Sequence, residues 1–224
     1  MMAPVKRSRL LSGIGADERV FLPQLKGLPN VLVPGWIEPK PRESLAGYAR
    51  RMAARVAPHG PCFVGGASFC GMLALEMARH LEAKCCFLIG SVASPREFPL
   101  WLTLPRVAPA VAHVLPFRPL VRASSLLLTK WPRAFSPCMR AFAEQIAQAN
   151  PHFLQWATGA LLEWKGAEPL TIPIYRIHGA KDRVLPLRTS RGIEIIPDGG
   201  HMVSLSHGPT VNRFLREKMA LHCG

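Results

Sequence analysis

Three residues have the types that nucleophilic catalysis by a serine requires, and they come in the order Ser68, Asp182 and His201. A serine hydroxyl is a poor nucleophile at its own pKa, so it needs a histidine that takes its proton. The histidine in turn needs a carboxylate, which fixes its tautomer and stabilises the imidazolium that forms. Each of the three follows a segment with a strand-like pattern, and the carboxyl ends of parallel strands share one edge of a sheet. The pattern therefore predicts a site for acyl transfer.

The segment around the serine has the pattern of a strand, a sharp turn and a helix, and it reads Gly65-Gly66-Ala67-Ser68-Phe69-Cys70-Gly71. Apolar residues 62–64 precede it, and a periodic apolar segment at 72–81 follows it. A serine can sit at the tip of so tight a turn only if the residues two positions away are small. Gly66 meets this demand, and Cys70 nearly does. The alternative is a glycine-rich connection without chemistry, because such short matches also arise by chance.

Two predicted strands near the C-terminus would place the acid and the base. Residues 172–177 and 192–196 have strand patterns, and Asp182 and His201 follow them. His201 lies in a glycine-rich loop, where a histidine has little structural use. Asp182 could instead only cap a turn, and Glu97, which follows an earlier strand, is a rival for the acid.

Two other histidines have structural interpretations. His178 ends the strand at 172–177, and we expect it to hydrogen-bond the backbone of the loop that follows. His207 could cap the last helix, which is predicted to begin near residue 209.

A glycine-rich loop follows the first predicted strand, at 9–11, and it reads Ser12-Gly13-Ile14-Gly15-Ala16-Asp17. Such a loop brings backbone N–H groups to the edge of the sheet where ligands bind, so it is a candidate for holding an oxyanion. The third glycine and the later ribose-binding acid of dinucleotide motifs are missing, which argues against a nucleotide cofactor.

The alternation of strand and helix patterns predicts an α/β fold, with a parallel sheet covered by helices on both faces. Further strands are predicted at 31–33, 62–64 and 84–89. A length of 224 residues and a hydrophobic content of 49% suit one well-buried domain.

Residues 95–165 have a different pattern, in which prolines punctuate short helical segments and no strand is predicted. Serine or asparagine before proline marks two helix starts, at 136–137 and 150–151. This helical insertion could be a lid over a pocket or ordinary core packing. Its tryptophans suggest a hydrophobic acyl group in the substrate: Trp101, Trp131, Trp156 and Trp164.

Four segments together resemble the α/β-hydrolase superfamily, and the resemblance extends from Leu10 to Met219. They are the loop at 11–17, the serine turn at 66–71, His178-Gly179-Ala180-Lys181-Asp182-Arg183-Val184-Leu185-Pro186, and Gly199-Gly200-His201-Met202. The resemblance implies a three-layer sandwich of about six parallel strands, with the family's strands in the order 4-3-5-6-7-8. It also implies a hydrolase core formed by 1–94 and 166–224, with a helical lid at 95–165.

The same resemblance implies roles for the site residues. Ser68 would be the nucleophile, His201 the base and Asp182 the acid, and the backbone N–H groups of Ile14 and Phe69 would form the oxyanion hole. Four features depart from the family pattern. Cys70 replaces the last glycine of the serine motif, and the oxyanion loop lacks the His-Gly or His-Gly-Gly-Gly of many lipases. The family's first two strands are missing, and the helix between acid and base is reduced to 187–191. No cofactor and no metal are expected.

The formal net charge of +14 raises nucleic acid or anionic lipid as partners. Lys and Arg outnumber Asp and Glu by ten to four in residues 1–60, eight to three in 95–165 and eight to five in 166–224. The excess is therefore spread along the chain, and no nucleic-acid-binding motif accompanies it. We expect no specific nucleic-acid site, while contact with a membrane surface stays open.

The six cysteines show no metal-ligand spacing, and those in predicted strands are expected to be reduced core residues. Acidic and basic residues at 17–19 interrupt any signal-peptide core, and prolines and arginines interrupt the apolar stretch at 100–128. The sequence thus predicts a cytoplasmic protein.

The sequence favours a serine hydrolase that cleaves a carboxylic ester, or a thioester, through an acyl-enzyme. One alternative is a hydrolase-fold protein that binds a ligand with little or no catalysis. A basic binder of nucleic acid or anionic membranes is a third reading, and it rests on charge alone.

Overall fold

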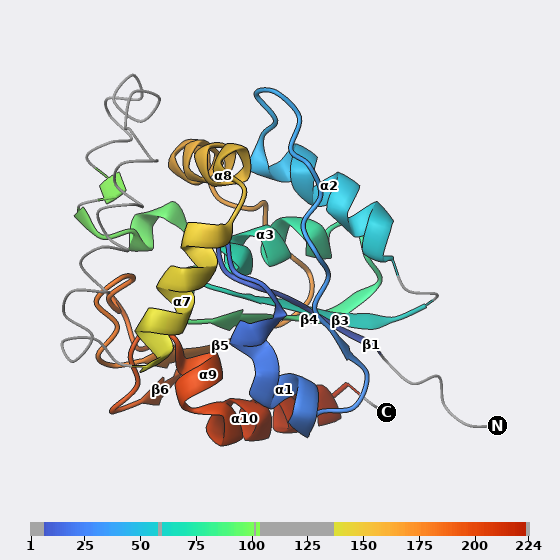
Figure 1. The fold of residues 1–224 in the computed structure, drawn as a ribbon. Coiled ribbons are helices and arrows are strands. Elements are labelled where there is room, and N and C mark those ends of the chain that lie inside the picture. Colours follow the sequence, from blue (N-terminus) through green and yellow to red (C-terminus); the bar gives the residue numbers. More distant parts are fainter. Residues whose placement is uncertain (1–6, 58–59, 101, 104–136, 223–224) are drawn as a thin grey trace.

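A computed structural model of the chain describes residues 7–57, 60–100, 102–103 and 137–222 (Figure 1). In these residues a single sheet holds six strands in the order β2-β1-β3-β4-β5-β6. Every neighbouring pair is parallel. The strands are β1 (Arg7–Leu11), β2 (Val31–Leu32), β3 (Cys62–Ala67), β4 (Ala83–Ile89), β5 (Ile174–Gly179) and β6 (Ile193–Ile196).

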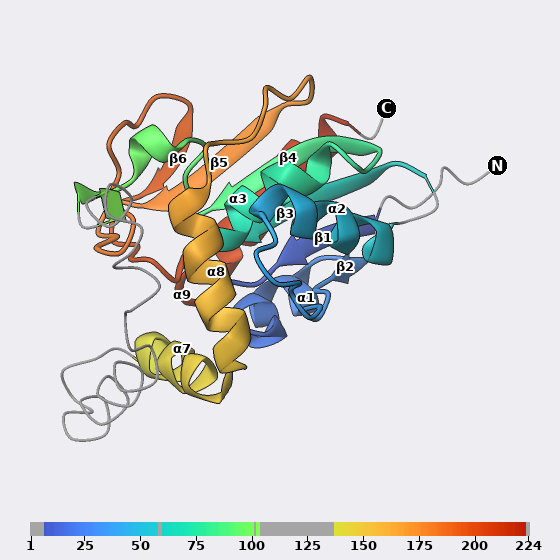
Figure 2. The same cartoon turned by 90° about the horizontal axis from the view of Figure 1, so that it is seen from above.

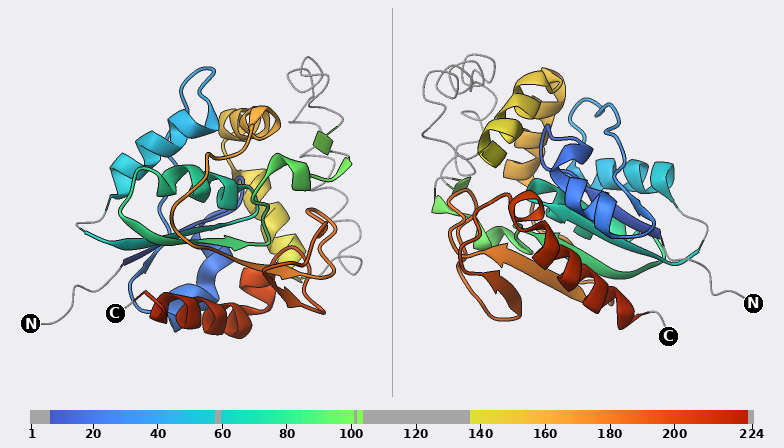
Figure 3. Two further views of the ribbon diagram at one scale, coloured as in Figure 1. Left: turned by 180° about the vertical axis from the view of Figure 1, so that it is seen from behind. Right: turned by 60° about the horizontal axis from the view of Figure 1, so that its bottom comes forward.

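Helices cover both faces of the sheet, which gives the three layers predicted from the sequence (Figure 3). In chain order the helices are η1 (Glu18–Phe21), α1 (Leu22–Gly27), α2 (Leu45–Val56), α3 (Phe69–Ala78), η2 (Pro95–Glu97), α7 (Pro137–Gln148), α8 (Pro151–Glu163), α9 (Val203–Ser206) and α10 (Gly208–Ala220). One face is covered by α2, α3 and α8, and the other by α1 and α10.

Alternation along the strands builds two cores, because successive side chains of a strand point to opposite faces of the sheet. In β4, Cys86 and Leu88 pack beneath α2 and α3, whereas Cys85 and Phe87 pack against α10. Strands buried on both faces read as the continuous apolar runs found in the sequence. The three strand cysteines, including Cys62 of β3, are buried.

The order of the strands is the one that the resemblance implied, so the predicted fold class and topology are confirmed. Two elements differ from the prediction. β5 extends to Gly179, so His178 lies inside the strand. Residues 187–191 form no helix. The chain instead turns into β6, because the carbonyl of Ser190 accepts from the N–H of Ile193 at 3.1 Å and Gly192 has a φ of 71°.

Within the predicted insertion, α8 packs directly on the core. Asn150 caps the helix by accepting a hydrogen bond from the N–H of His152 at 2.9 Å. The ring of Trp156 lies 4.2 Å from that of Tyr48 in α2, and Trp164 Nε1 donates to the buried carboxylate of Glu76 in α3 at 2.8 Å. Figure 2 shows α8 running across the sheet, with α7 at its N-terminal end.

α8 therefore packs on the core, and the lid role of the insertion stays a prediction. Nearly half of the predicted lid lies outside the described residues, at 101 and 104–136, and Trp101 and Trp131 are among them. The division of the chain at 94 and 165 stays a prediction. Of the helices described, none is long and apolar enough to cross a membrane.

Candidate active site

Ser68 lies at the turn between β3 and α3, in a conformation that L-residues rarely adopt. Its φ is 54° and its ψ is −131°. The turn is so tight that a Cβ atom on Gly66 would lie 2.0 Å from the carbonyl oxygen of Cys70. Only glycine fits there, as the sequence predicted. Strain of this kind persists where surrounding contacts hold it, and it exposes the serine hydroxyl at the edge of the sheet.

Ser91, which follows β4, supports the turn and was not singled out from the sequence. Its hydroxyl donates to the carbonyl of Ser68 at 2.6 Å, and the N–H of Ser68 donates to the carbonyl of Ile89 at 3.1 Å. A Cβ on Gly71 would lie 2.2 Å from the Ser91 hydroxyl oxygen, so the helix approaches β4 closely here. A lone serine after a strand carries no sequence signal for this contact.

His201 joins Ser68 to Asp182 through hydrogen bonds at both ring nitrogens. Nε2 lies 2.9 Å from Ser68 Oγ, and Nδ1 lies 2.8 Å from Asp182 Oδ2. Because a carboxylate only accepts, Nδ1 carries the proton, and Nε2 is left free to accept the serine proton. The side chains of His201 and Asp182 are almost completely buried. The structure thus brings together the three residues that the sequence proposed as nucleophile, base and acid.

Asp182 is held as a carboxylate by donors on both oxygens. Oδ1 accepts from the backbone N–H groups of Val184 and Leu185 at 2.8 and 2.9 Å. Burial alone would raise the pKa of Asp182, but the hydrogen bonds from His178 and His201 outweigh it and hold this pKa well below its usual range. A permanent carboxylate is what a histidine base needs as its partner.

His178 contacts the same carboxylate oxygen as His201. Its Nε2 lies 2.8 Å from the carbonyl oxygen of Leu185 and 3.0 Å from Asp182 Oδ2. Since both are acceptors, Nε2 carries a proton that the two oxygens share. The expected bond to the loop backbone is present, but the sequence did not predict the contact with Asp182. The signal available was the four-residue spacing of histidine and aspartate at the end of a strand.

The other polar candidates are engaged elsewhere. Glu97 forms an ion pair with Arg176 of β5 and accepts from the N–H of Ala93 at 3.2 Å. His207 occupies the N-cap position of α10, but its ring makes no capping bond; it contacts Asp198 instead, at 3.3 Å. In the part of the chain that the structure describes, the carboxylate that contacts His201 belongs to Asp182.

Cys70 is the second residue of α3 and has no exposed surface. Burial raises the pKa of its thiol well above the usual value, so it stays protonated. A buried thiol of this kind is a small packing residue, and it offers no rival nucleophile.

The candidate oxyanion loop leaves the sheet beside the serine turn, because β1 and β3 are neighbours and Leu11 pairs with Gly66. The hydroxyl of Ser12 donates to the carbonyl of Ala16 at 2.8 Å, and Gly15 turns the chain with φ of 65°. Across from the loop, Phe69 begins α3, so its N–H has no acceptor within the helix and lies at the positive end of the helix dipole. Both backbone segments named by the sequence prediction thus lie at one edge of the sheet.

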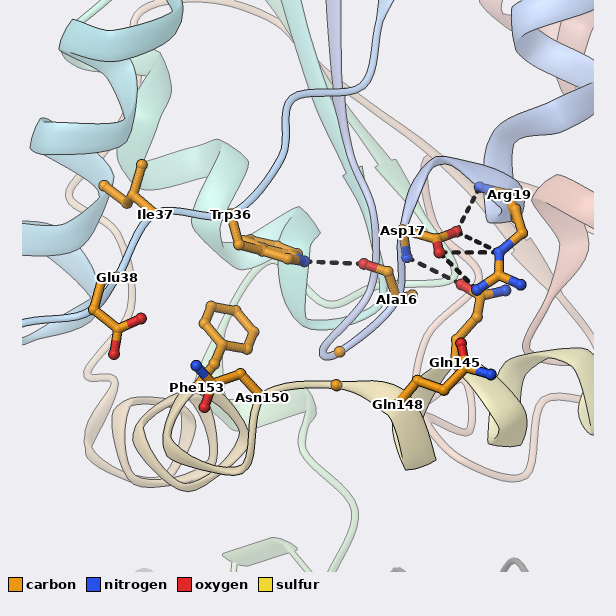
Figure 4. Close-up of a pocket in the computed structure, with 12 residues that line it drawn as sticks. Ala16, Asp17, Arg19, Trp36, Ile37, Glu38, Gln145, Gln148, Asn150 and Phe153 are labelled. Carbon is orange, nitrogen blue, oxygen red and sulfur yellow. Dashed lines mark hydrogen bonds and ion pairs between the residues drawn. The ribbon is translucent and has the colours of Figure 1, made fainter.

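A cavity of about 400 Å³ lies beside this loop, between it, residues 36–38 and the corner where α7 meets α8 (Figure 4). A second, of about 840 Å³, lies between residues 38–43 and α8. Neither is lined by Ser68, Asp182 or His201. Among the described residues, no group of three His, Cys, Asp or Glu side chains could hold a metal ion.

Solved structures share this fold over nearly the whole chain. An esterase from Thermogutta terrifontis with malate bound has a TM-score of 0.74 at 18% identity, over 96% of this chain and 89% of its own. A hydrolase from Oleispira antarctica has a TM-score of 0.70 at 14% identity, over 97% and 92%. The enol-lactonase from Burkholderia xenovorans LB400 has a TM-score of 0.67 at 15% identity, over 96% and 92%.

Among curated proteins, none matches the sequence significantly. The sequence model of the alpha/beta hydrolase family, by contrast, matches residues 8–213, which include the serine turn, the acid, the histidine loop and the glycine-rich loop. The chain therefore belongs to the alpha/beta hydrolase family.

Proposed function

We propose that this protein is a serine hydrolase that cleaves a carboxylic ester, or a thioester, through an acyl-enzyme. The observation that carries the proposal is the unbroken chain of hydrogen bonds from Asp182 through His201 to Ser68, with distances of 2.8 and 2.9 Å. The strained turn at Ser68 and the ionised, buried Asp182 support it. The fold is shared with structures named an esterase and an enol-lactonase, and lactones are cyclic esters.

In the first half of the reaction, Ser68 Oγ attacks the ester carbonyl carbon while His201 Nε2 takes its proton. The carbonyl oxygen becomes an oxyanion, which the N–H groups of Ile14 and Phe69 stabilise. Asp182 stabilises the imidazolium and keeps its orientation. His201 then gives the proton to the alcohol or thiol that leaves, and Ser68 is acylated.

In the second half, a water molecule takes the place of the leaving group. His201 accepts one of its protons, and the remaining hydroxide attacks the acyl carbon through a second oxyanion. The collapse of this intermediate returns the proton to Ser68 and releases the acid. No cofactor enters either half, and the same three side chains serve both.

The hydrophobic acyl group predicted from the tryptophans stays a proposal. Trp156 and Trp164 pack on Tyr48 and Glu76 in the core, so these two do not support it. A series of p-nitrophenyl esters with acyl chains of increasing length tests it through kcat/KM.

The test of the function compares the wild type, Ser68→Ala and the exposed control Ser190→Ala on a short p-nitrophenyl ester. We expect Ser68→Ala to lose about 10³-fold or more in kcat and the control to keep full activity. A fluorophosphonate should label the wild type and Ser190→Ala but not Ser68→Ala. Wild-type protein that neither turns over esters nor is labelled would favour the alternative of a hydrolase-fold binding protein.

A further inference from the structure

Helix α7 touches the loop that carries Ile14, through a glutamine. Gln145 is 3% exposed, and its Oε1 accepts a hydrogen bond from the backbone N–H of Asp17 at 3.0 Å. Figure 4 shows this side chain reaching from the helix to the loop. The two residues are 128 positions apart, so the bond ties the helical insertion to the first turn after β1.

The same loop is held from other sides as well. The carbonyl of Ala16 accepts from Ser12 Oγ at 2.8 Å. It also accepts from Trp36 Nε1 at 2.9 Å (Figure 4). At Gly15, a Cβ would lie 2.8 Å from Leu154 Cδ2 and 3.0 Å from the Cβ of Ala149. The corner between α7 and α8 thus packs on the loop at van der Waals distance, next to the Gln145 bond.

These contacts bear on catalysis because an oxyanion hole works only if its donors are in place before the charge forms. The direction of the Ile14 N–H depends on the backbone angles of the loop, and displacements of about 1 Å can cost about 10²-fold in rate. Trp36 and Ser12 hold the carbonyl of Ala16. Gln145 holds the N–H of Asp17, which belongs to the same peptide group.

We propose that Gln145 is a positioning residue for the oxyanion hole, and that α7 thereby forms a working part of the active site. The residue touches neither substrate nor nucleophile; it acts through the loop at 13–17. The inference rests on the proposed hydrolase function. It predicts that loss of the Gln145 acceptor weakens binding of the transition state while binding of the substrate stays the same.

The test uses three variants of the full chain. Gln145→Leu removes the acceptor at similar size, and Gln145→Glu keeps an oxygen at the same reach. Gln148→Leu is the matched control, since Gln148 is an exposed residue of the same helix that lines the same cavity. For each variant, kcat and KM are measured on a p-nitrophenyl ester, together with the melting temperature. The affinity for a trifluoromethyl ketone is measured as well, because its hemiketal adduct with serine carries an oxyanion.

We expect Gln145→Leu to lower kcat by about tenfold at nearly constant KM, and to weaken the ketone by the same factor. Gln145→Glu should restore most of both, and Gln148→Leu should match the wild type. Trp36→Phe, which keeps the ring but removes one of the two donors to Ala16, provides a second probe and should change the same two quantities in the same direction.

Two results would overturn the inference. In the first, Gln145→Leu keeps the kcat and ketone affinity of the wild type. In the second, activity falls only in step with the melting temperature and Gln145→Glu does not restore it, which would make the role merely structural. A wild type that neither hydrolyses the ester nor binds the ketone would instead refute the proposed function and this inference with it.

Discussion

Asp182 accepts from two backbone N–H groups on one oxygen and from two imidazoles on the other. His201 is the imidazole that the proposed reaction uses. His178 is the other, and its proton is shared with the carbonyl of Leu185. Because each donor stabilises the negative charge, His178 makes Asp182 a weaker base than it would be with His201 alone.

We expect His178→Leu to shift the pH dependence of kcat/KM. Without the His178 donor, the carboxylate of Asp182 is more basic and stabilises the imidazolium of His201 more strongly. The acidic limb of the profile should therefore move to higher pH. A pH series of kcat/KM measures the shift. His178→Gln, which can still donate, should move the limb less, and an unchanged profile in His178→Leu would contradict the assignment.

The same variant makes a prediction about stability, whose sign follows from the lowered pKa of Asp182. A carboxylate with a depressed folded pKa contributes stability that is present above its unfolded pKa of about 3.9 and is lost as the pH falls through the folded pKa. In His178→Leu, the pKa of Asp182 in the folded protein is lowered by less. The free energy of unfolding of the variant should therefore lie furthest below that of the wild type at neutral pH, and the difference should become smaller below about pH 4. Urea unfolding at several pH values measures this difference.

At the scale of elements, the turn between β3 and α3 is fixed by close backbone approach. A Cβ on Gly66 would overlap the backbone of Cys70, whereas one on Gly159, within α8, would meet nothing within 4 Å. The structure thus excludes a side chain at Gly66 but has room for one at Gly159. One is required by the fold, and the other only adds chain entropy that folding must remove.

Alanine at the two positions should therefore have opposite effects. We expect Gly66→Ala to lower the free energy of unfolding by more than about 3 kcal/mol and to abolish activity, because the turn cannot close. Gly159→Ala should raise the free energy of unfolding by about 0.5–1 kcal/mol and leave kcat unchanged. Denaturant unfolding checks both, and a stable, active Gly66→Ala would refute the described turn.

Local sequence patterns predicted most of the elements. Ser44 caps α2 by accepting from the N–H of Gly47 at 3.1 Å, and Asn150 caps α8, as their positions before apolar periodic segments indicated. Caps and periodicity are read over a few residues, so the sequence carries them directly. The short helix expected at 187–191 is absent. A turn that closes with Gly192 at positive φ leads the chain directly into β6 there.

Over the whole molecule, the sequence predicted the three proposed catalytic residues but not the residues that hold the surrounding loops in place. Ser68, Asp182 and His201 follow β3, β5 and β6 in turn. Their positions after strands were enough to predict that they meet, because a parallel sheet has one carboxyl edge. Gln145 on the oxyanion loop and Ser91 on the serine turn could not be foreseen. In sequence each is an ordinary polar residue, and only tertiary packing decides what it touches.

The net charge of +14 also belongs to the whole molecule. Since the excess is spread along the chain, binding to DNA should be independent of base sequence and driven by counterion release. We expect two duplexes of different sequence to bind equally at about 50 mM salt and to dissociate by about 200 mM, as measured by fluorescence anisotropy. Retention of one duplex at the higher salt would instead indicate a specific nucleic-acid site.

The pairing of β4 with β5 divides the active site between two parts of the chain. Ser68 and the loop at 12–17 precede this junction, and Asp182 and His201 follow it. The two parts meet along a parallel register that runs from Cys86 opposite Ile174 to Ile89 opposite Ile177. If the chain were cut between these strands, neither fragment would carry a complete catalytic set. Ester turnover would then report the reunion of the fragments, which is the layout of a two-part complementation reporter.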